Sequence, residues 1–360
     1  MGPCRRLLVI EPYYGGSHKQ FLQQLQEQLD LSCSYLTLPA RKWMWRMRLA
    51  APWVAARLSS DMATDFDAVL CSTFVDVATL RGLAPAWFNK LPILTYFHEN
   101  QFAYPVRFKR DRDIQFGLTN YLTALASDRL GFNSQFNLNS FVAGCRDMEK
   151  RAPDVTLAGT ASILAKSSVL WPGLDFRPLD DLSTPSALQG PVVVWNHRWE
   201  HDKNPELFFQ TLYQLADEGV AFQLIVMGQS FSRQPAIFAE AQQRLRERII
   251  HFGYVPERAD YFRLLKKGTV VISTANHEFY GISVLEAVRA GCRPLLPRRL
   301  SYPELFDDQY LYSENDDLVA RLRTLLATAT CPLEPQLRVE LTEKYSWSVL
   351  RREYEKWLTF

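Results

Sequence analysis

Two glutamates stand eight positions apart in the stretch HEFYGISVLEAVRAG, residues 277–291. Apolar residues recur at helical spacing after Gly281, which predicts a helix that ends near Gly291. Glu278 then lies in the loop before this helix, and Glu286 lies within it. Carboxylates accept hydrogen bonds from vicinal hydroxyls, so one glutamate can hold a sugar ring and the other a ribose. The alternative is that both are solvated helix charges, which is the commoner fate of glutamate.

The start of the same predicted helix offers backbone amides. The amides from Phe279 to Ile282 would point out of the helix start, which favours a phosphate or a polarised sugar oxygen. Gly281 has no side chain and leaves this approach open. We therefore expect Phe279, Tyr280, Gly281 and Ile282 to lie at the ligand.

Two cations follow a predicted buried strand in WNHRWEHDKNP, residues 195–205. Arg198 and Lys203 flank the loop between this strand and the next helix, and Asp202 or Asn204 can cap that helix. Two positive charges near a helix N-terminus suit a diphosphate, whose negative charge grows as it leaves a reacting carbon. The alternative is ordinary surface charge, and we favour the diphosphate.

Paired glycines follow the first predicted strand in EPYYGGSHKQF, residues 11–21. Gly15 and Gly16 let a ligand approach the backbone, and Ser17 can cap the helix that follows. The pattern lacks both the G-x-G-x-x-G and the G-x-x-x-x-G-K-[ST] spacing, so neither a dinucleotide site nor a P-loop is indicated. An ordinary tight turn is the alternative.

His98 stands at the carboxyl end of another predicted strand, 92–99. Imidazole titrates near neutrality, so this residue can hydrogen-bond a substrate hydroxyl or move a proton. A strand histidine is more often a satisfied structural residue, but its position at the end of a strand favours a functional role.

Two basic stretches contain aromatic residues. RKWMWRMR (41–48) and RFKRDR (107–112) place cations beside Trp43, Trp45 and Phe108. Cations bind phosphate and aromatic rings stack on unpaired bases, which suits a single-stranded RNA loop. The alternative is that the tryptophans belong to the core and the cations coat a solvated face.

The elements that must position these residues alternate along the chain. Short apolar runs and longer amphipathic stretches predict two α/β units, each with a doubly wound parallel sheet. The expected strands are 6–12, 67–72, 92–99, 128–133, 191–198, 222–228, 249–255 and 269–275. A helix is expected over 204–219, and the stretch 172–191, which contains Pro, Gly, Ser and Asp, marks a linker. Because ligands bind beyond the carboxyl ends of parallel strands, we expect one site in the cleft between the domains.

The amino-acid composition limits which class of protein this chain can belong to. The chain has 360 residues, 47% hydrophobic content and a formal net charge of +2, which fits two globular domains and not a disordered chain. Its six cysteines show neither metal spacing nor a disulfide framework, so we expect reduced thiols, no metal and a cytoplasmic location. No stretch approaches the roughly 18 apolar residues of a membrane span. We also expect no membrane contact and no obligate protein partner.

The combination of motifs resembles a known family. The E-x7-E pair, the Arg/Lys pair and the Gly-Gly loop resemble the retaining GT-B glycosyltransferases of family 4. EPYYGGSHKQF, LPARKWMWRMR, YFHENQFAYP, FGLTNYLTALASDRLGFNSQFNLNSF and WNHRWEHDKNP resemble the tRNA-queuosine α-mannosyltransferase group and its bacterial relatives.

This resemblance implies transfer of mannose from GDP-mannose to queuosine in a tRNA anticodon, with retention and without an obligatory cofactor or metal. It implies that Arg198 and Lys203 hold the diphosphate, Glu286 the ribose and Glu278 the transferred sugar, and that His98 contacts this sugar near the reacting centre. It adds Gly15, Gly16, Tyr254 and Val255 to the donor site. The acceptor candidates are Ser17, His18, Lys42, Trp43, Trp45, Arg46, Glu99, Asn100, Gln101 and Asn133.

The implied domains are two Rossmann-like units of a GT-B fold. Residues 1–172 would bind the acceptor and residues 191–344 the nucleotide sugar, with a linker at 173–190 and a helix at 345–360 that crosses back to the first domain. Two other readings stay open. One is a family 4 enzyme with another nucleotide-sugar donor or a glycan or small-molecule acceptor, and the other is a non-catalytic RNA-binding module.

Overall fold

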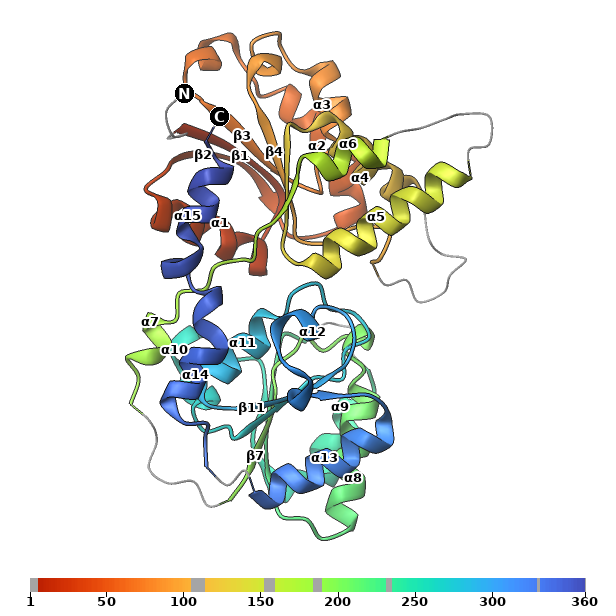
Figure 1. Ribbon diagram of the computed structural model, residues 1–360, viewed down its shortest axis with the longest axis vertical. Coiled ribbons are helices and arrows are strands. Elements are labelled where there is room, and N and C mark those ends of the chain that lie inside the picture. The colour runs from red at the N-terminus through yellow and green to blue at the C-terminus, as the bar shows by residue number, and fades with distance from the viewer. Residues whose placement is uncertain are drawn as a thin grey trace. The chain divides into compact units, whose positions relative to one another are not determined.

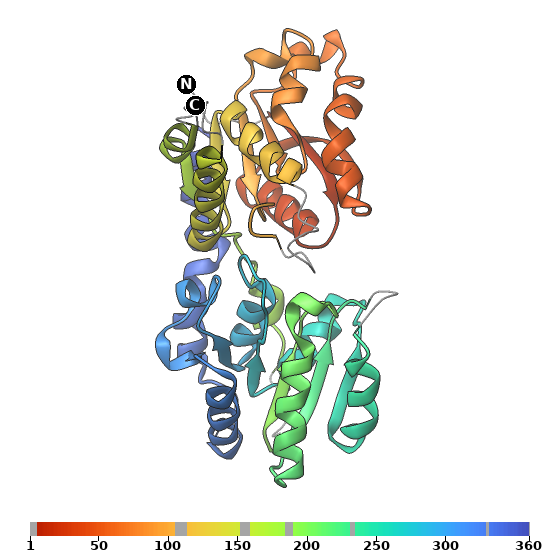
Figure 2. The ribbon, with the colours of Figure 1, turned by 90° about the vertical axis from the view of Figure 1, so that its right-hand side faces the viewer.

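The chain folds into two units, each built around a parallel sheet with helices on both faces (Figures 1 and 2). Unit 1 comprises Met1–Leu174 and Trp347–Phe360, and unit 2 comprises Asp175–Ser346. The computed structural model describes residues 6–104, 114–151, 159–183, 190–230, 235–328 and 331–359. The basic run predicted at 107–112 therefore lies outside the described residues.

Unit 1 has six parallel strands in the order β2-β1-β3-β4-β5-β6. They are β1 (Arg6–Tyr14), β2 (Ser32–Pro39), β3 (Ala68–Ser72), β4 (Ile93–Phe97), β5 (Arg129–Phe132) and β6 (Ser167–Val169). Their helices are α1 (Gly16–Leu29), α2 (Trp43–Ala55), α3 (Val77–Leu83), α4 (Ile114–Ala126), α5 (Gln135–Lys150), α6 (Gly159–Ala165) and α15 (Trp347–Trp357).

The first strand shows why the sheet of unit 1 is buried on both faces. Successive side chains of a strand point to opposite faces, and every residue from Leu7 to Ile10 is apolar and buried. Leu7 and Val9 belong to the core that α1 and α15 cover, whereas Leu8 and Ile10 belong to the core that α2 and α3 cover. Figure 1 shows α15, from the end of the chain, beside α1.

Unit 2 also has six parallel strands, in the order β12-β11-β10-β7-β8-β9. They are β7 (Val192–Trp195), β8 (Gln223–Met227), β9 (Ile249–Gly253), β10 (Val270–Ile272), β11 (Arg293–Pro297) and β12 (Leu311–Tyr312). Their helices are α7 (Arg177–Asp180), α8 (Pro205–Asp217), α9 (Ile237–Arg244), α10 (Arg258–Leu265), α11 (Ile282–Ala290), α12 (Tyr302–Leu305), α13 (Asn315–Thr328) and α14 (Pro335–Thr342). Side chains of α8, α9 and α13 form one core with β7, β8 and β10.

All eight strands predicted from the sequence are present, most of them with shorter bounds. The predicted helices are confirmed as α8 and α11, and the Asn204 side chain caps α8 by accepting a hydrogen bond from the Leu207 amide. The sequence pattern missed β2, β6, β11 and β12. β6 and β12 have only three and two residues, β2 is exposed or half-buried along its length, and β11 contains two prolines, which are uncommon inside strands.

The strand orders locate the place where each unit can bind a ligand. The direction in which strands are added reverses between β1 and β3 in unit 1 and between β7 and β10 in unit 2. A crevice opens beyond the carboxyl ends of strands at such a switch point. In the part of the chain that the structure describes, no helix is both long and apolar enough to cross a bilayer.

Candidate active site

The glycine loop of unit 1 joins β1 to α1. A Cβ atom on Gly15 would lie 2.7 Å from the Cβ of Ala40, so this position has no room for a side chain. Gly15 is the N-terminal cap of α1, and no side chain caps this helix. The prediction that Ser17 is the cap is therefore wrong: Ser17 already lies in the first turn, because the helix begins one residue earlier, at Gly16.

A buried carboxylate at the end of β1 holds the first turn of α1. Glu11 is 1% exposed, and its oxygens accept hydrogen bonds from the Tyr13 amide (2.8 Å), the Ser72 hydroxyl (3.0 Å) and His18 Nδ1 (2.9 Å). His18 Nε2 lies 3.5 Å from Glu99 Oε2. Burial alone would lower the pKa of His18, but these two carboxylates outweigh it and raise this pKa to about 10.

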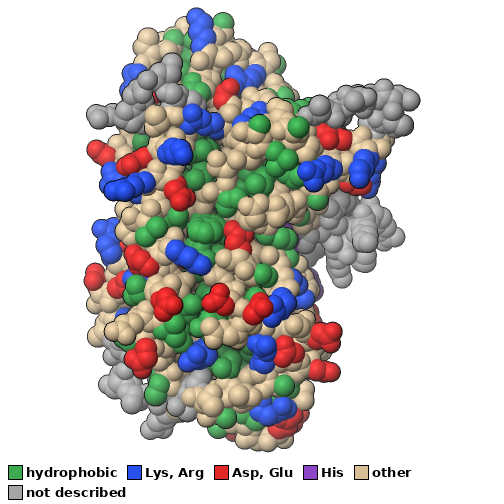
Figure 3. Space-filling model, viewed as in Figure 1, with side chains coloured by type: hydrophobic (Ala, Val, Ile, Leu, Met, Phe, Trp, Pro, Cys, Tyr) green, Lys and Arg blue, Asp and Glu red, His purple; other side chains and the backbone are tan. Residues whose placement is uncertain are grey.

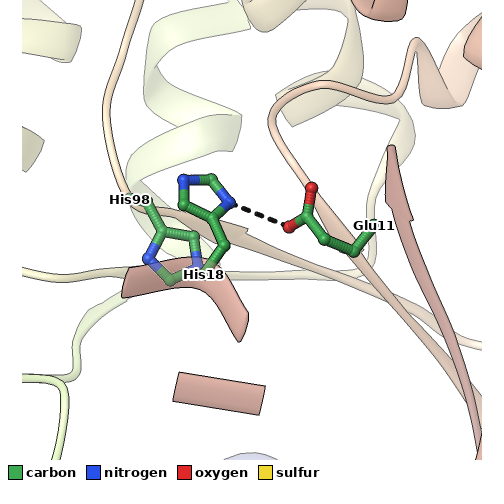
Figure 4. Close-up of side chains that lie close together, drawn as sticks. All are labelled: Glu11, His18 and His98. Carbon is green, nitrogen blue, oxygen red and sulfur yellow. Dashed lines mark hydrogen bonds and ion pairs between the residues drawn. The ribbon is translucent and has the colours of Figure 1, made fainter. Parts of the chain in front are cut away.

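The ring of His98 lies against the ring of His18. The ring centroids are 4.0 Å apart with an interplanar angle of 29°, and Figure 4 shows the two imidazoles beside Glu11. Burial, and then the charge on His18, lower the pKa of His98 well below its usual value. Among the described residues, none donates to or accepts from the ring nitrogens of His98. A neutral His98 is therefore available to a substrate hydroxyl.

Among the described residues, Glu11, His18 and His98 form a group whose potential metal-ligand atoms all lie within 4.8 Å of one another. A preformed site needs lone pairs that converge on one point. Here the two imidazoles stack face to face, and both ring nitrogens of His18 already face carboxylates. This geometry fits an ion-paired cluster better than a metal site.

Three other acceptor candidates lie around the His98 loop. The amide of Asn133 donates to the His98 carbonyl oxygen (2.7 Å), and the Gln101 backbone amide donates to Asn120. The Asn100 side chain donates to Asn137 and accepts from the Ala103 amide. These bonds hold the loop in place, which explains why polar residues are buried there.

The start of α2 carries the aromatic candidates. Trp43 is half-buried and packs on Tyr104 and Phe116, so it belongs to a small aromatic core. Trp45 is 57% exposed. Lys42 is exposed at the N-terminal cap, and Arg46 donates to the Pro39 carbonyl oxygen. Of the two tryptophans, Trp45 is the more exposed to solvent.

In unit 2, the loops after β7 and β10 meet at an ion pair. Lys203 is 5% exposed, and its Nζ contacts the His277 carbonyl oxygen (2.6 Å), Asp202 (3.1 Å) and Glu278 (3.4 Å). Burial would raise the pKa of Glu278, but the charge of Lys203, with help from His197 and His277, lowers it to about 2. Glu278 is therefore an ionised acceptor of hydrogen bonds, positioned by a buried cation.

The structure does not place Arg198 in the same contact. Arg198 is half-exposed and pairs with Glu200 at 3.1 Å. Its neighbour His197 is buried, and burial together with the charge of Lys203 lowers the pKa of His197 to about 4. The His197 Nε2 atom is buried without a hydrogen-bond partner. A buried polar atom of this kind is available to a ligand or a water molecule.

Glu286, the second glutamate of the motif, is held by two side chains from α10. Arg258 donates to its Oε1 at 2.7 Å, and the Tyr261 hydroxyl donates to its Oε2 at 3.1 Å. Asn196, directly after β7, donates to the Tyr261 oxygen (3.0 Å) and to the Ser283 carbonyl oxygen (2.7 Å). The chain of contacts fixes the orientation of the Glu286 carboxylate.

The remaining donor candidates lie at the expected elements. Gly281 caps α11 with a φ of 115°, a conformation that favours glycine. Phe279 and Tyr280 are buried and Ile282 is half-buried, so these residues offer backbone more than side chain. Tyr254 and Val255 follow β9, and the Tyr254 ring is 59% exposed.

Comparison with known proteins identifies the family. The model of the N-terminal domain of tRNA-queuosine α-mannosyltransferases matches residues 6–174, and the model of group 1 glycosyl transferases matches residues 180–343. A tRNA-queuosine α-mannosyltransferase of Drosophila melanogaster is 38% identical over 326 residues, which are 88% of this chain and 85% of the relative. This chain belongs to the tRNA-queuosine α-mannosyltransferase family. The resemblance expected from the motifs is confirmed.

Solved structures of more distant proteins share the fold. Anabaena HepE in complex with UDP has a TM-score of 0.70 at 14% identity, and sucrose-phosphate synthase of Thermosynechococcus elongatus has a TM-score of 0.71 at 12% identity. Each match covers 98% of both chains. This member of the mannosyltransferase family therefore has the GT-B fold with two Rossmann-like units, as predicted.

Sequence reasoning missed several polar residues of this family member's site. Glu11 had a visible signal, because an acidic residue inside the apolar run RLLVIEP is unusual. Asn196 follows a buried strand directly, which is another signal. The sequence contains no signal for Arg258 and Tyr261, since their hydrogen bonds to Glu286 depend on how α10 packs beside α11.

Proposed function

We propose that this enzyme transfers mannose from GDP-mannose to queuosine in the anticodon of tRNA, with retention at the anomeric carbon. Family membership carries the proposal, because the relative with 38% identity is a tRNA-queuosine α-mannosyltransferase. The polar groups at the switch points of both sheets support it, since they suit the hydroxyls and the diphosphate of a nucleotide sugar. A tRNA acceptor agrees with the cytoplasmic location expected from the sequence.

Unit 2 would hold the donor. Glu286 would accept hydrogen bonds from the ribose hydroxyls, and Glu278 from the hydroxyls of mannose. The amides at the start of α11 would face the diphosphate. Arg198 is half-exposed and can turn from Glu200 to a phosphate, whereas the three N–H groups of Lys203 already face protein acceptors. Lys203 would act on the diphosphate through its charge.

The reaction would be a same-face displacement. The bond from the anomeric carbon to the diphosphate breaks as the bond to the acceptor oxygen forms, and the proton of the acceptor hydroxyl passes to the departing diphosphate. Positive charge from Arg198 and Lys203 would stabilise the leaving group without a metal ion. His98, in its neutral form, would hydrogen-bond a hydroxyl of the transferred sugar and so orient it.

Unit 1 would receive the tRNA. Figure 3 shows basic and acidic side chains interspersed on one face of the protein, and the net charge is only +2. RNA must then be held by a local surface and not by the field of the whole protein. The exposed Trp45, with Lys42 beside it, offers a ring for stacking and a cation for phosphate.

The deciding experiment is an assay with tRNA. The protein is incubated with GDP-mannose and tRNA that carries queuosine, and the nucleosides are analysed by mass spectrometry. We expect one added hexose on queuosine. The same tRNA with guanosine at the anticodon position is the control and should gain nothing. An unchanged queuosine nucleoside would refute the proposal.

A further inference from the structure

The two nitrogens of the His18 ring both face carboxylates. Nδ1 lies 2.9 Å from Glu11 and Nε2 lies 3.5 Å from Glu99. A neutral imidazole has one N–H donor and one lone pair, so one of these contacts would set a lone pair against a negative oxygen. Only the imidazolium, with two N–H donors, satisfies both contacts. The geometry therefore defines His18 as a cation.

The carboxylate of Glu11 cannot turn away from this cation. Its other oxygen accepts hydrogen bonds from the Tyr13 amide and the Ser72 hydroxyl, and the residue is 1% exposed. A buried carboxylate that is fully hydrogen-bonded is a strong anchor for the ring that it pairs with. The position of the charge on His18 is thus set by β1 and β3 as well as by α1.

The ring of His98 stacks on this cation. The ring centroids of His18 and His98 are 4.0 Å apart. A second positive charge at this distance would be strongly unfavourable, because like charges repel more strongly in a protein interior than in water. Burial lowers the pKa of His98 most, and the charge on His18 lowers it further.

We propose that His18 is a positioning residue, whose ion-paired ring keeps the stacked ring of His98 neutral so that His98 offers hydrogen bonds and not a charge to the substrate. This inference deepens the proposed function and rests on it for the role of His98. Neutral His98 retains one donor and one acceptor nitrogen, which fits a sugar hydroxyl. A charged His98 would lose its acceptor nitrogen.

Other titratable groups also surround His98. Tyr96 from β4 packs edge-on against its ring at 4.7 Å, and Cys71 from β3 lies with Glu11 in the same small cavity. The pKa values of both Tyr96 and Cys71 are raised by burial, so both are neutral near pH 7. Glu99 faces His18 from the loop after β4. His18 is therefore the one positive charge among these groups.

The test is the titration of His98 itself. NMR of protein labelled in the histidine rings follows His98 across pH, and assignment uses a His98→Gln variant. In His18→Gln the stacked charge is absent, so we expect His98 to titrate at higher pH than in the wild type. In His18→Lys a cation is retained, and we expect less change. The kcat/KM for tRNA should fall as the pH is lowered from about 7.5 to about 5.5. In His18→Gln this fall should exceed that of the wild type by a factor of roughly three or more.

Lys19→Gln is the matched control, because Lys19 is an exposed cation on the same helix. It should leave the titration of His98 unchanged. If His18→Gln does not fold, the double variant Glu11→Gln/His18→Gln replaces it, since two neutral amides can pair in the same place. An unchanged titration of His98 without His18, or an equal shift in Lys19→Gln, would overturn the inference. The titration needs no substrate, so absent mannosyl transfer by the wild type would refute the proposed function alone.

Discussion

At the scale of single residues, two ion pairs of the described chain contain buried charges. Lys203 and Glu278 form one such pair in unit 2, and His18 with Glu11 forms another in unit 1. Burying an ion is costly unless a partner and hydrogen bonds compensate it. Lys203 and Glu278 come from the loops after β7 and β10, so their pair also holds these two loops together, whereas Glu11 and His18 join β1 to the first turn of α1.

Glu278→Gln should lower kcat by about 100-fold, since loss of the carboxylate misplaces the transferred sugar.

The pKa of Glu278 is lowered in the folded state, so its contribution to stability is present above about pH 4.5 and is lost as pH falls toward 2. Urea unfolding across this range should show the difference between wild type and Glu278→Gln shrinking as pH falls. Glu247→Gln, which changes an exposed glutamate of unit 2, should behave like wild type at every pH.

Tyr261→Phe should weaken donor binding while kcat changes little. The hydroxyl of Tyr261 links Asn196 to Glu286, and loss of one hydrogen bond of about 1 kcal/mol corresponds to a roughly fivefold rise in the KM for the donor. Initial-rate kinetics test this. Tyr35→Phe is the control, because it removes a tyrosine hydroxyl that donates to Gln26 within unit 1, which does not contain Glu286. An unchanged donor KM would show that Glu286 needs no such support.

At the scale of elements, two helices of unit 1 differ in how much of their surface they bury. Helix α15 completes the core of unit 1, because Leu350, Tyr354 and Trp357 pack on β1, β3 and β4. Helix α2 instead presents part of its surface to solvent, with Trp45 as its largest exposed ring. Changes in α15 should therefore alter stability, and changes at Trp45 should alter substrate binding.

Trp357→Ala should lower the free energy of unfolding by about 3–5 kcal/mol, as expected for a buried tryptophan. Trp357 is 5% exposed, and its carbonyl oxygen accepts a hydrogen bond from Arg129. Chemical denaturation measures the loss. Val349→Ala on the same helix removes a side chain that is 49% exposed and should cost less than about 0.5 kcal/mol.

Trp45→Ala should raise the KM for tRNA by roughly tenfold and leave the KM for the donor unchanged, because stacking on one base contributes about 1–3 kcal/mol. Trp45→Phe should retain most of the affinity. Leu83→Ala, at an equally exposed apolar residue on α3, is the matched control. If Trp45→Ala and Leu83→Ala behave alike, α2 does not bind the tRNA.

At the scale of the whole molecule, the proposed function assigns the donor to unit 2 and the tRNA to unit 1. A donor that binds unit 2 in its native state stabilises the protein by about 2.7 kcal/mol at a hundredfold excess over Kd. GDP-mannose should therefore raise the Tm more than UDP-glucose does at equal concentration, as measured by thermal unfolding. Glu286→Gln should reduce the shift, because the ribose loses its acceptor. Equal shifts for both nucleotide sugars would contradict the donor assignment.

The sequence by itself determined the fold class, eight of the strands and the places of the two glutamates. These features follow from local patterns: apolar runs of strand length, helical spacing and glycine at helix ends. It also carried the family, because the motifs EPYYGGSHKQF and YFHEN are specific. The pattern missed β2 because its residues are exposed or half-buried, and it missed β12 because two residues are too few to form an apolar run.

Only the tertiary structure decided which side chains meet. The pairing of Lys203 with Glu278 joins residues 75 positions apart, and the stacking of His18 on His98 joins helix α1 to the loop after β4. Likewise, Trp43 proved to be part of a core while Trp45 proved to be exposed. Such contacts depend on strand order and helix packing, which bring distant residues together at the carboxyl edge of a sheet. No local pattern in the chain contains that information.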